Sequence, residues 1–212
     1  VWRASRLEYL SINYILQKYS REGMDYFYKA LKAPTVYANY IRRDLAPNIP
    51  QWRKDGVDIP DFADTLKFAF DQMQKAIAED PLNYSIYLSR ADMAITAFPF
   101  DPSYLEQAEK DVQAANALAP NHQSALYITA KIQYLKGDKT GAIAAMKKAI
   151  DLAPAAGDPY FYYALLLFNN GDQEEALIQL QKSVDLGRYP RNGNEARVLA
   201  GYFGDAGDYN KA

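Results

Sequence analysis

The stretch KGDKTGAIAAMKKAIDLAP, residues 136–154, decides the fold that we expect for this chain. A second stretch of the same pattern, NGDQEEALIQLQKSVDLG, covers residues 170–187, so the Gly-Asp pair recurs at Gly137 and Gly171, 34 positions apart. This period is typical of a helix–turn–helix unit that stacks on its neighbours, because one unit cannot bury its apolar face alone. We therefore expect an array of helix pairs whose function resides on a surface.

The unit around the first stretch, which we call repeat 3, shows how each helix pair is built. Its apolar spacing predicts one helix over 123–135 and, after the Gly-Asp turn, another over 139–152. Small Ala130 and Ala142 stand where the two helices must approach closely. Pro154 ends the unit, because proline lacks a backbone N–H and disfavours helix in the residue before it. The next unit, which contains the second stretch, is repeat 4.

Composition limits the classes of protein and partner. The 212 residues are 49% hydrophobic, yet no run reaches the roughly 18–20 apolar residues that span a membrane. The absence of cysteine excludes disulfides, thiolate zinc sites and cysteine nucleophiles. Residues 1–60 carry ten basic and six acidic side chains, and the remainder fourteen and twenty. Neither part has a dense basic patch, so we expect no nucleic-acid partner.

Two regions differ in how closely they follow the repeat. Residues 1–80 are interpreted as divergent helical repeats, with Gly23 at the small position of a second helix and a long loop at 46–61, where three prolines and a glycine occur. Residues 81–212 are interpreted as regular repeats, the last one incomplete, because 196–208 resembles a first helix and turn without a partner. The apolar face of that helix should lack a cover. The chain begins without Met and ends within this unit, so we expect a fragment.

No constellation of catalytic or metal-binding residues is evident. The single histidine, His122, has no orienting partner or nucleophile nearby in the sequence, so we interpret it as a surface or helix-capping residue. Gly-rich phosphate loops, metal-binding histidine pairs and nucleophile elbows are absent from the sequence. We therefore expect no enzyme activity in this fragment, no cofactor and no metal.

The residues of repeat 3 resemble the signature of the tetratricopeptide repeat family, small–small–large–small–proline, at Ala130, Ala142, Met146, Ala149 and Pro154. The resemblance implies an all-α fold, a right-handed superhelical array of antiparallel helix pairs, in which the first helices line a concave groove. Repeat 4 departs from the family pattern, since Ser183 replaces the usual alanine and Arg188 the usual proline. We expect its end to be irregular.

The family's register implies a set of groove residues on two first helices: Tyr127, Lys131 and Tyr134 in repeat 3, with Asp158, Phe161, Leu165, Phe168 and Asn169 in repeat 4. Aromatic residues recur at equivalent places, so we expect a ladder of rings along the groove. These rings either bind a ligand or fill the space between neighbouring helices, because aromatic side chains serve both purposes. The Lys–Asn clamp with which some family members hold a peptide carboxylate is not reproduced, since Ser124, Tyr127 and Lys131 occupy the corresponding places.

The order of features also resembles the soluble tail of bacterial O-antigen ligase- and polymerase-type membrane proteins. In those proteins a helix like VWRASRLEYLSINYIL, residues 1–16, follows the last membrane span, and a segment like residues 20–47 comes next. This resemblance implies an extracytoplasmic accessory domain of a membrane glycosyltransferase, tethered to the membrane by a part of the protein beyond this fragment. If the resemblance to ligase tails does not hold, we expect a cytoplasmic location.

Three functional classes are consistent with these observations. The first is a non-catalytic scaffold that holds a protein or peptide in a concave, aromatic-lined groove. The second is the accessory domain of a ligase-like membrane protein, which binds glycan or a partner. The third is an unrecognised hydrolase.

Overall fold

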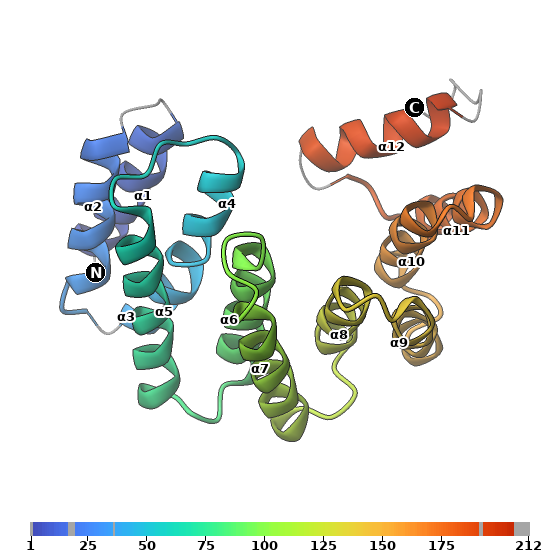
Figure 1. The fold of residues 1–212 in the computed structure, drawn as a ribbon, viewed down its shortest axis with the longest axis horizontal. Helices are drawn as coiled ribbons and strands as arrows, with labels where there is room; N and C mark the ends of the chain where they lie inside the picture. The colour runs from blue at the N-terminus through green and yellow to red at the C-terminus, as the bar shows by residue number, and fades with distance from the viewer. Residues whose placement is uncertain (1, 17–19, 36, 191–192, 206–212) are drawn as a thin grey trace. The chain divides into compact units, whose positions relative to one another are not determined.

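The computed structural model describes residues 2–16, 20–35, 37–190 and 193–205, and every regular element in these ranges is a helix. Twelve helices lie within these ranges (Figure 1): α1 (Trp2–Leu16), α2 (Ser20–Lys32), α3 (Ala38–Leu45), α4 (Asn48–Lys54), α5 (Phe62–Glu79), α6 (Tyr84–Ala97), α7 (Tyr104–Leu118), α8 (Gln123–Leu135), α9 (Lys139–Leu152), α10 (Gly157–Asn170), α11 (Gln173–Asp185) and α12 (Gly193–Asp205). The most extensive contacts join four pairs of consecutive helices, namely α1 with α2, α6 with α7, α8 with α9, and α10 with α11. The predicted all-α fold of helix pairs is confirmed.

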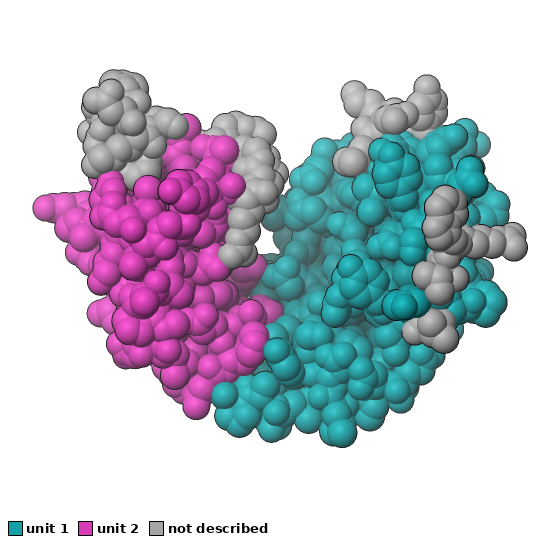
Figure 2. Space-filling view, turned by 180° about the vertical axis from the view of Figure 1, so that it is seen from behind, with its two compact units in different colours: residues 1–120 teal, residues 121–212 magenta. Residues whose placement is uncertain are grey.

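The chain forms two compact units, residues 1–120 and residues 121–212, which are teal and magenta in Figure 2. Each unit has its own hydrophobic core. The division does not coincide with the boundary between residues 80 and 81, which separates divergent from regular repeats in the sequence. That boundary concerns the regularity of the repeats and stays a prediction.

The first helix pair of unit 1 packs closely at Gly23. A Cβ atom at this position would lie 2.4 Å from Cγ1 of Ile15, closer than side-chain atoms approach, so only glycine fits. Phe27, one turn later on α2, is fully buried, with its ring centroid 6.5 Å from that of Trp52 and 6.2 Å from that of Phe68 in edge-on geometry. These rings join α2, α4 and α5 in one core.

Residues 46–61 are not the long loop that the sequence predicted, because they contain α4. Pro50 lies in the first turn of this helix, where the backbone N–H groups have no intrahelical acceptor, so the proline removes no hydrogen bond there. Ile49 and Trp52 are buried in the core of unit 1, and their burial favours the helical conformation. The segment then turns at Gly56, with φ at 85°.

Helices α6 and α7 are joined by a buried ion pair. Nε of Arg90 donates to Oδ2 of Asp111 at 2.8 Å, and Nη2 donates to Oδ1 at 2.5 Å. Gln74 accepts a further hydrogen bond from the guanidinium, and Nε2 of Gln107 donates to Oδ1 of Asp111 at 3.1 Å. Such partners offset the cost of removing two charges from water, so the pair fixes how α6 meets α7.

Repeat 3 has the predicted boundaries, since α8 and α9 cover the residues expected for its two helices. Gly137 makes the turn between them with φ at 82°, a conformation that favours glycine. Asp138 caps α9 by accepting a hydrogen bond from the backbone N–H of Gly141 at 2.9 Å. Ala130 and Ala142 are buried between the helices, as predicted for close approach.

Repeat 4 ends at a buried arginine. Arg188 is 6% exposed; its Nε donates to Oδ1 of Asp158 at 2.6 Å and its Nη2 to Oε2 of Glu195 at 2.9 Å. Its guanidinium carbon lies 4.3 Å from the ring centroid of Phe161. Burial alone would lower the pKa of Arg188, but the hydrogen bonds to Glu195 and Asp158 raise it, so the side chain remains charged.

The last described helix, α12, packs against repeat 4. Leu199 is 7% exposed and joins a small core with Phe161, Ala164 and Leu180. The ring of Tyr202 stacks on that of Phe168, with centroids 3.5 Å apart and planes 2° from parallel. Leu199 is therefore covered, contrary to the prediction of an uncovered apolar face. The side chains of Val198 and Phe203, and the predicted turn at residues 207–208, lie outside the described residues.

Candidate functional site

An open pocket of about 190 Å³ lies between α8 and α10, the first helices of repeats 3 and 4. Apolar and aromatic side chains form most of its lining, which consists of Tyr127, Ala130, Lys131, Tyr134, Met146, Tyr162, Leu165, Leu166 and Asn169. We call it the groove pocket. Buried Ala130 and Met146 form its floor, and exposed Lys131 and Asn169 stand at its rim.

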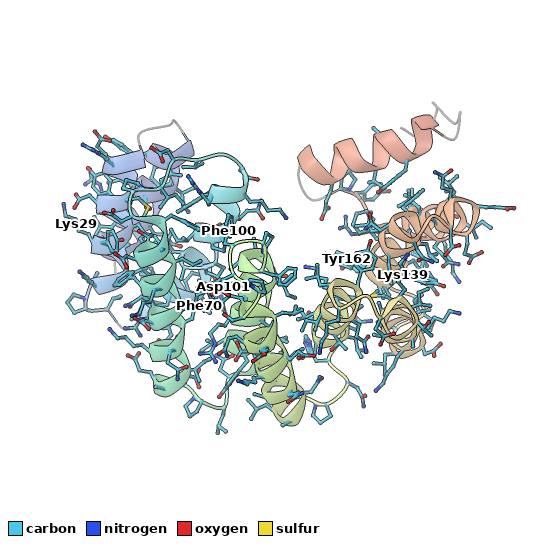
Figure 3. All side chains as sticks on the ribbon, in the orientation of Figure 1. Lys29, Phe70, Phe100, Asp101, Lys139 and Tyr162 are labelled. Atoms are coloured by element: carbon cyan, nitrogen blue, oxygen red, sulfur yellow. The ribbon has the colours of Figure 1, made fainter. Side chains whose placement is uncertain are left out.

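Tyrosine side chains connect α8 and α10 at two places in the groove pocket. The ring centroids of Tyr127 and Tyr162 are 4.8 Å apart, with the ring planes inclined by 44°. Tyr162 is labelled on α10 in Figure 3. Further along the helices, the hydroxyl of Tyr134 donates to the backbone carbonyl of Asn169 at 3.4 Å. Because both contacts cross between the repeats, they fix the position of α10 against α8.

A second pocket of about 390 Å³, which we call the polar pocket, lies where α8 and α10 begin. It is lined by Asn121, His122, Gln123, Ser124, Tyr127, Asp158 and Tyr162. His122 precedes α8 and makes no side-chain capping bond to it. Tyr127 and Tyr162 line both pockets, so the two adjoin. Together they form a groove along α8 and α10 that is polar at the helix starts and apolar further along.

The structure brings together most of the residues predicted for the groove. Five of the eight line the groove pocket, namely Tyr127, Lys131, Tyr134, Leu165 and Asn169. Asp158 lines the polar pocket, where it also accepts the hydrogen bond from Arg188. Their role in binding stays a prediction.

Phe161 and Phe168 do not lie where the sequence placed them. Phe161 is 1% exposed, beneath Arg188 in the small core of repeat 4, and Phe168 is stacked against Tyr202. Neither lines the groove pocket or the polar pocket. The predicted ladder of four rings is therefore wrong for these two positions, because Arg188 and α12 cover them.

Sequence reasoning missed four lining residues: Ala130, Met146, Tyr162 and Leu166. Ala130 and Met146 were interpreted only as packing residues between α8 and α9. Tyr162 was missed because the prediction matched residues 34 apart, whereas Tyr127 meets the residue 35 positions later. The same offset joins Tyr134 to Asn169. The run of residues 160–163 is aromatic throughout, so its composition does not single out Tyr162, although Tyr162 alone among these four is not buried in the structure.

The groove pocket offers groups suited to binding. It combines an apolar floor with aromatic rings, the ammonium group of Lys131 and the amide group of Asn169 at the rim. Within the described ranges, no group of three or more His, Cys, Asp or Glu side chains is placed to hold a metal ion. No helix in the described part of the chain combines the length and the hydropathy that crossing a membrane requires.

Comparison with known proteins agrees with this fold. The family model of the tetratricopeptide repeat matches residues 105–159, which include α8 and α9. No curated protein is significantly similar to the chain. A thermophilic tetratricopeptide repeat protein of Thermus thermophilus is similar in structure, with 17% identity, a TM-score of 0.65, and coverage of 94% of this chain and 98% of that one.

Two further solved structures show the same fold. A tetratricopeptide repeat protein from Parabacteroides merdae has 15% identity and a TM-score of 0.53 over 98% of this chain and 75% of its own. MamA from Desulfovibrio magneticus has 14% identity and a TM-score of 0.51 over 90% of this chain and 98% of its own. None of these matches bears on the resemblance to O-antigen ligase tails. Residues 105–159 thus carry tetratricopeptide repeat sequence, and the chain has the fold of tetratricopeptide repeat proteins.

Proposed function

We propose that this chain is a non-catalytic scaffold that holds an extended peptide of a protein partner along α8 and α10. Proteins with this fold generally bind protein partners on the surface that their first helices form. One observation carries the proposal: Tyr127 and Tyr162 line both the groove pocket and the polar pocket. An apolar and a polar binding surface therefore follow one another along the same two helices, as an extended peptide requires.

The size of the groove pocket favours a single side chain as its occupant. Its volume of about 190 Å³ is small beside the roughly 300–1,000 Å³ of pockets that enclose drug-sized ligands. It is closer to a cavity of about 150 Å³, which holds one benzene molecule. We therefore assign it to one aromatic or branched aliphatic side chain of the partner.

The polar pocket favours the neighbouring part of the same peptide. An extended chain advances about 3.3–3.6 Å per residue and points successive side chains to opposite sides. Because the two pockets share a wall, residues one or two positions from the apolar side chain would reach the polar pocket. Ser124, His122 and the carboxylate of Asp158 supply hydrogen-bonding groups there.

A glycan is the alternative occupant, and it would suit an accessory domain of an O-antigen ligase-like membrane protein. Sugar rings stack on the faces of tyrosine rings, which flank the groove pocket. The inclination of 44° between Tyr127 and Tyr162 favours a peptide, because two inclined rings contact a side chain from two sides and offer no single flat platform.

The test begins with a display library of random peptides selected on the whole chain. The strongest selected peptide is then titrated against the unmodified protein and against Asn169→Trp, which places a large ring at the exposed rim of the groove pocket without removing a core residue. We expect the variant to bind at least about tenfold more weakly, since residues in a central contact dominate affinity. Ala144→Trp, at an exposed position of α9 outside both pockets, is the matched control and should bind normally.

Charge provides a second matched pair. Lys131→Glu reverses a charge at the rim of the groove pocket, and Lys148→Glu makes the same change on the exposed face of α9. Peptide affinity that is equal in all four variants would refute the groove as the binding site. Isolated periplasmic glycans, titrated in parallel, decide the alternative: glycan binding that Asn169→Trp weakens, with no peptide selected, would replace the peptide by a glycan.

A further inference from the structure

We infer that unit 1 carries a binding site for a compact oxyanion, a phosphate or a carboxylate group, in a pocket between α2, α3 and α5. The pocket is open and has a volume of about 410 Å³. The lining residues that carry the inference are Lys32, Arg42, Phe68, Gln72, Lys75 and Glu79. They lie in the other unit from the groove, so the inference does not depend on the proposed function.

Charge in this pocket is predominantly positive. Lys32, Arg42 and Lys75 line it, and Glu79 is the one carboxylate among the described residues of the lining. The chain as a whole has a net charge of −2, so this excess of cations is local. Cations gathered in a concave surface raise the local concentration of anions, because the low-dielectric walls focus their field.

Arg42 has more N–H donors than its hydrogen bonds to the described residues use. Its Nη1 donates to Oδ1 of Asn39 at 2.8 Å and to Oε2 of Glu79 at 2.7 Å. Its Nε is enclosed and has no acceptor among the described residues. A guanidinium group carries five N–H donors in a planar fork, which suits the paired oxygens of a carboxylate or phosphate. Glu79, whose side chain is half exposed, holds the fork at the pocket without using all of it.

Gln72 is the feature that points to a ligand. It is 2% exposed, yet it lines the pocket, and its side-chain amide makes no hydrogen bond with any residue in the described ranges. Its amide atoms are not among the enclosed polar atoms that lack a partner, so they meet solvent at the pocket wall, where a bound group can contact them. An anion in the pocket would supply an acceptor oxygen for the Gln72 N–H donors.

The two lysines are placed to complete the site. The ammonium of Lys32 lies 5.6 Å from the ring centroid of Phe68 and 5.7 Å from that of Tyr28, so cation–π contacts hold it at the pocket wall. Lys75 is exposed on α5 one turn after Gln72, and residues three apart share a helix face. An oxyanion beside Gln72 would therefore have Lys75 as its neighbour.

The test is a nuclear magnetic resonance titration of the whole chain with sodium phosphate and, separately, sodium acetate, each against sodium chloride at the same ionic strength. We expect a saturable shift of the signals of the Gln72 side-chain amide and the Arg42 guanidinium group with phosphate, acetate or both. Whichever anion saturates the shift identifies the oxyanion class. Shifts that chloride reproduces, or that fail to saturate with either anion, would overturn the inference.

Variants assign the site to these residues. Lys75→Gln removes a charge at an exposed position, and Gln72→Leu removes the amide at similar volume; each should weaken binding about tenfold. Lys67→Gln, an exposed lysine on α5 that does not line the pocket, is the matched control and should leave the affinity unchanged. An equal loss in Lys67→Gln and Lys75→Gln would show general charge screening and overturn the site. If Gln72→Leu fails to fold, the comparison of Lys75→Gln with Lys67→Gln still tests the site.

Discussion

Repeats 3 and 4 each carry an aromatic residue near the end of their first helix, Tyr134 and Phe168. Only Tyr134 borders the groove. Tyr134 lines the groove pocket, whereas Phe168, 34 residues later, is stacked against Tyr202. The difference lies in the helix that packs next to each pair. The helix α10 leaves a pocket beside Tyr134, and α12 covers the ring of Phe168. Whether an aromatic ring at this position of a repeat borders the groove or is covered therefore depends on the helix that packs next to it.

The ends of the two repeats differ as well. Repeat 3 ends at Pro154, and Nε2 of Gln123 donates to the carbonyl of Ala149 at 3.3 Å. In repeat 4 the residue equivalent to Gln123 is Gly157, where a Cβ would lie 2.5 Å from Cβ of Arg188. Repeat 3 thus closes through proline stereochemistry and one hydrogen bond. Repeat 4 ends instead at the buried charge of Arg188, which fits because Gly157 has no side chain.

The largest effect that we expect comes from removing that charge. Arg188→Ala leaves Asp158 and Glu195 without their cation and should lower the free energy of unfolding by about 3 kcal/mol, the lower end of the range for broken buried pairs, because both carboxylates are partly exposed. Urea unfolding measures the change. Pro154→Ala is the counterpart in repeat 3 and should cost less than about 1 kcal/mol. Equal costs at the two positions would contradict the difference between the repeat ends.

A smaller loss of stability is expected from substitutions at Gly157 and Gln123, the equivalent residues that contact the ends of repeats 4 and 3. Gly157→Ala forces a Cβ against Arg188 and against the carbonyl of Ser183, 2.7 Å away, and should cost about 1–3 kcal/mol by overpacking. Gln123→Ala removes one hydrogen bond and should cost about 1 kcal/mol. Thermal unfolding of the two variants side by side tests the order. A Gly157→Ala variant that is as stable as the unmodified protein would mean that Arg188 does not need this space.

The smallest of the expected stability changes concerns the cover of Phe168. Tyr202→Ala removes the stacked ring and should cost about 0.5–1.5 kcal/mol. Hydrogen exchange should become faster in α12, while α8 and α9 keep their protection, because Tyr202 stacks on Phe168 and packs against the small core of repeat 4. Exchange in α12 that does not change would show that the stack does not hold this helix.

Local signals made repeat 3 predictable from its sequence. Gly137 in a left-handed turn, Asp138 capping α9 and Pro154 after its end are interactions between neighbours in the chain, and they fix the helix boundaries. The helix α4 escaped prediction because its conformation depends on burying Ile49 and Trp52 against distant helices.

The candidate site was predictable only in part, for a related reason. The repeat pattern predicts which helix carries a groove residue. Tyr134 and Leu165 were predicted in this way, and both line the groove pocket. The rotation of one repeat against the next depends on packing between them, and a difference of one residue exchanged Tyr162 for Phe161. The pocket inferred to bind an oxyanion combines residues of α2, α3 and α5, and no pattern in the sequence relates Arg42 to Gln72.

The most direct test of the proposed groove compares the two equivalent rings. The peptide selected on the whole chain is titrated against Tyr134→Ala and Phe168→Ala by calorimetry, after circular dichroism has shown that both variants are folded. Tyr134→Ala should weaken binding at least about fivefold, since a ring in a binding contact contributes more than about 1 kcal/mol. Phe168→Ala should stay within roughly twofold of the unmodified protein, because its ring faces Tyr202 rather than the groove pocket. Equal losses in the two variants, or a loss only in Phe168→Ala, would contradict binding in the groove pocket.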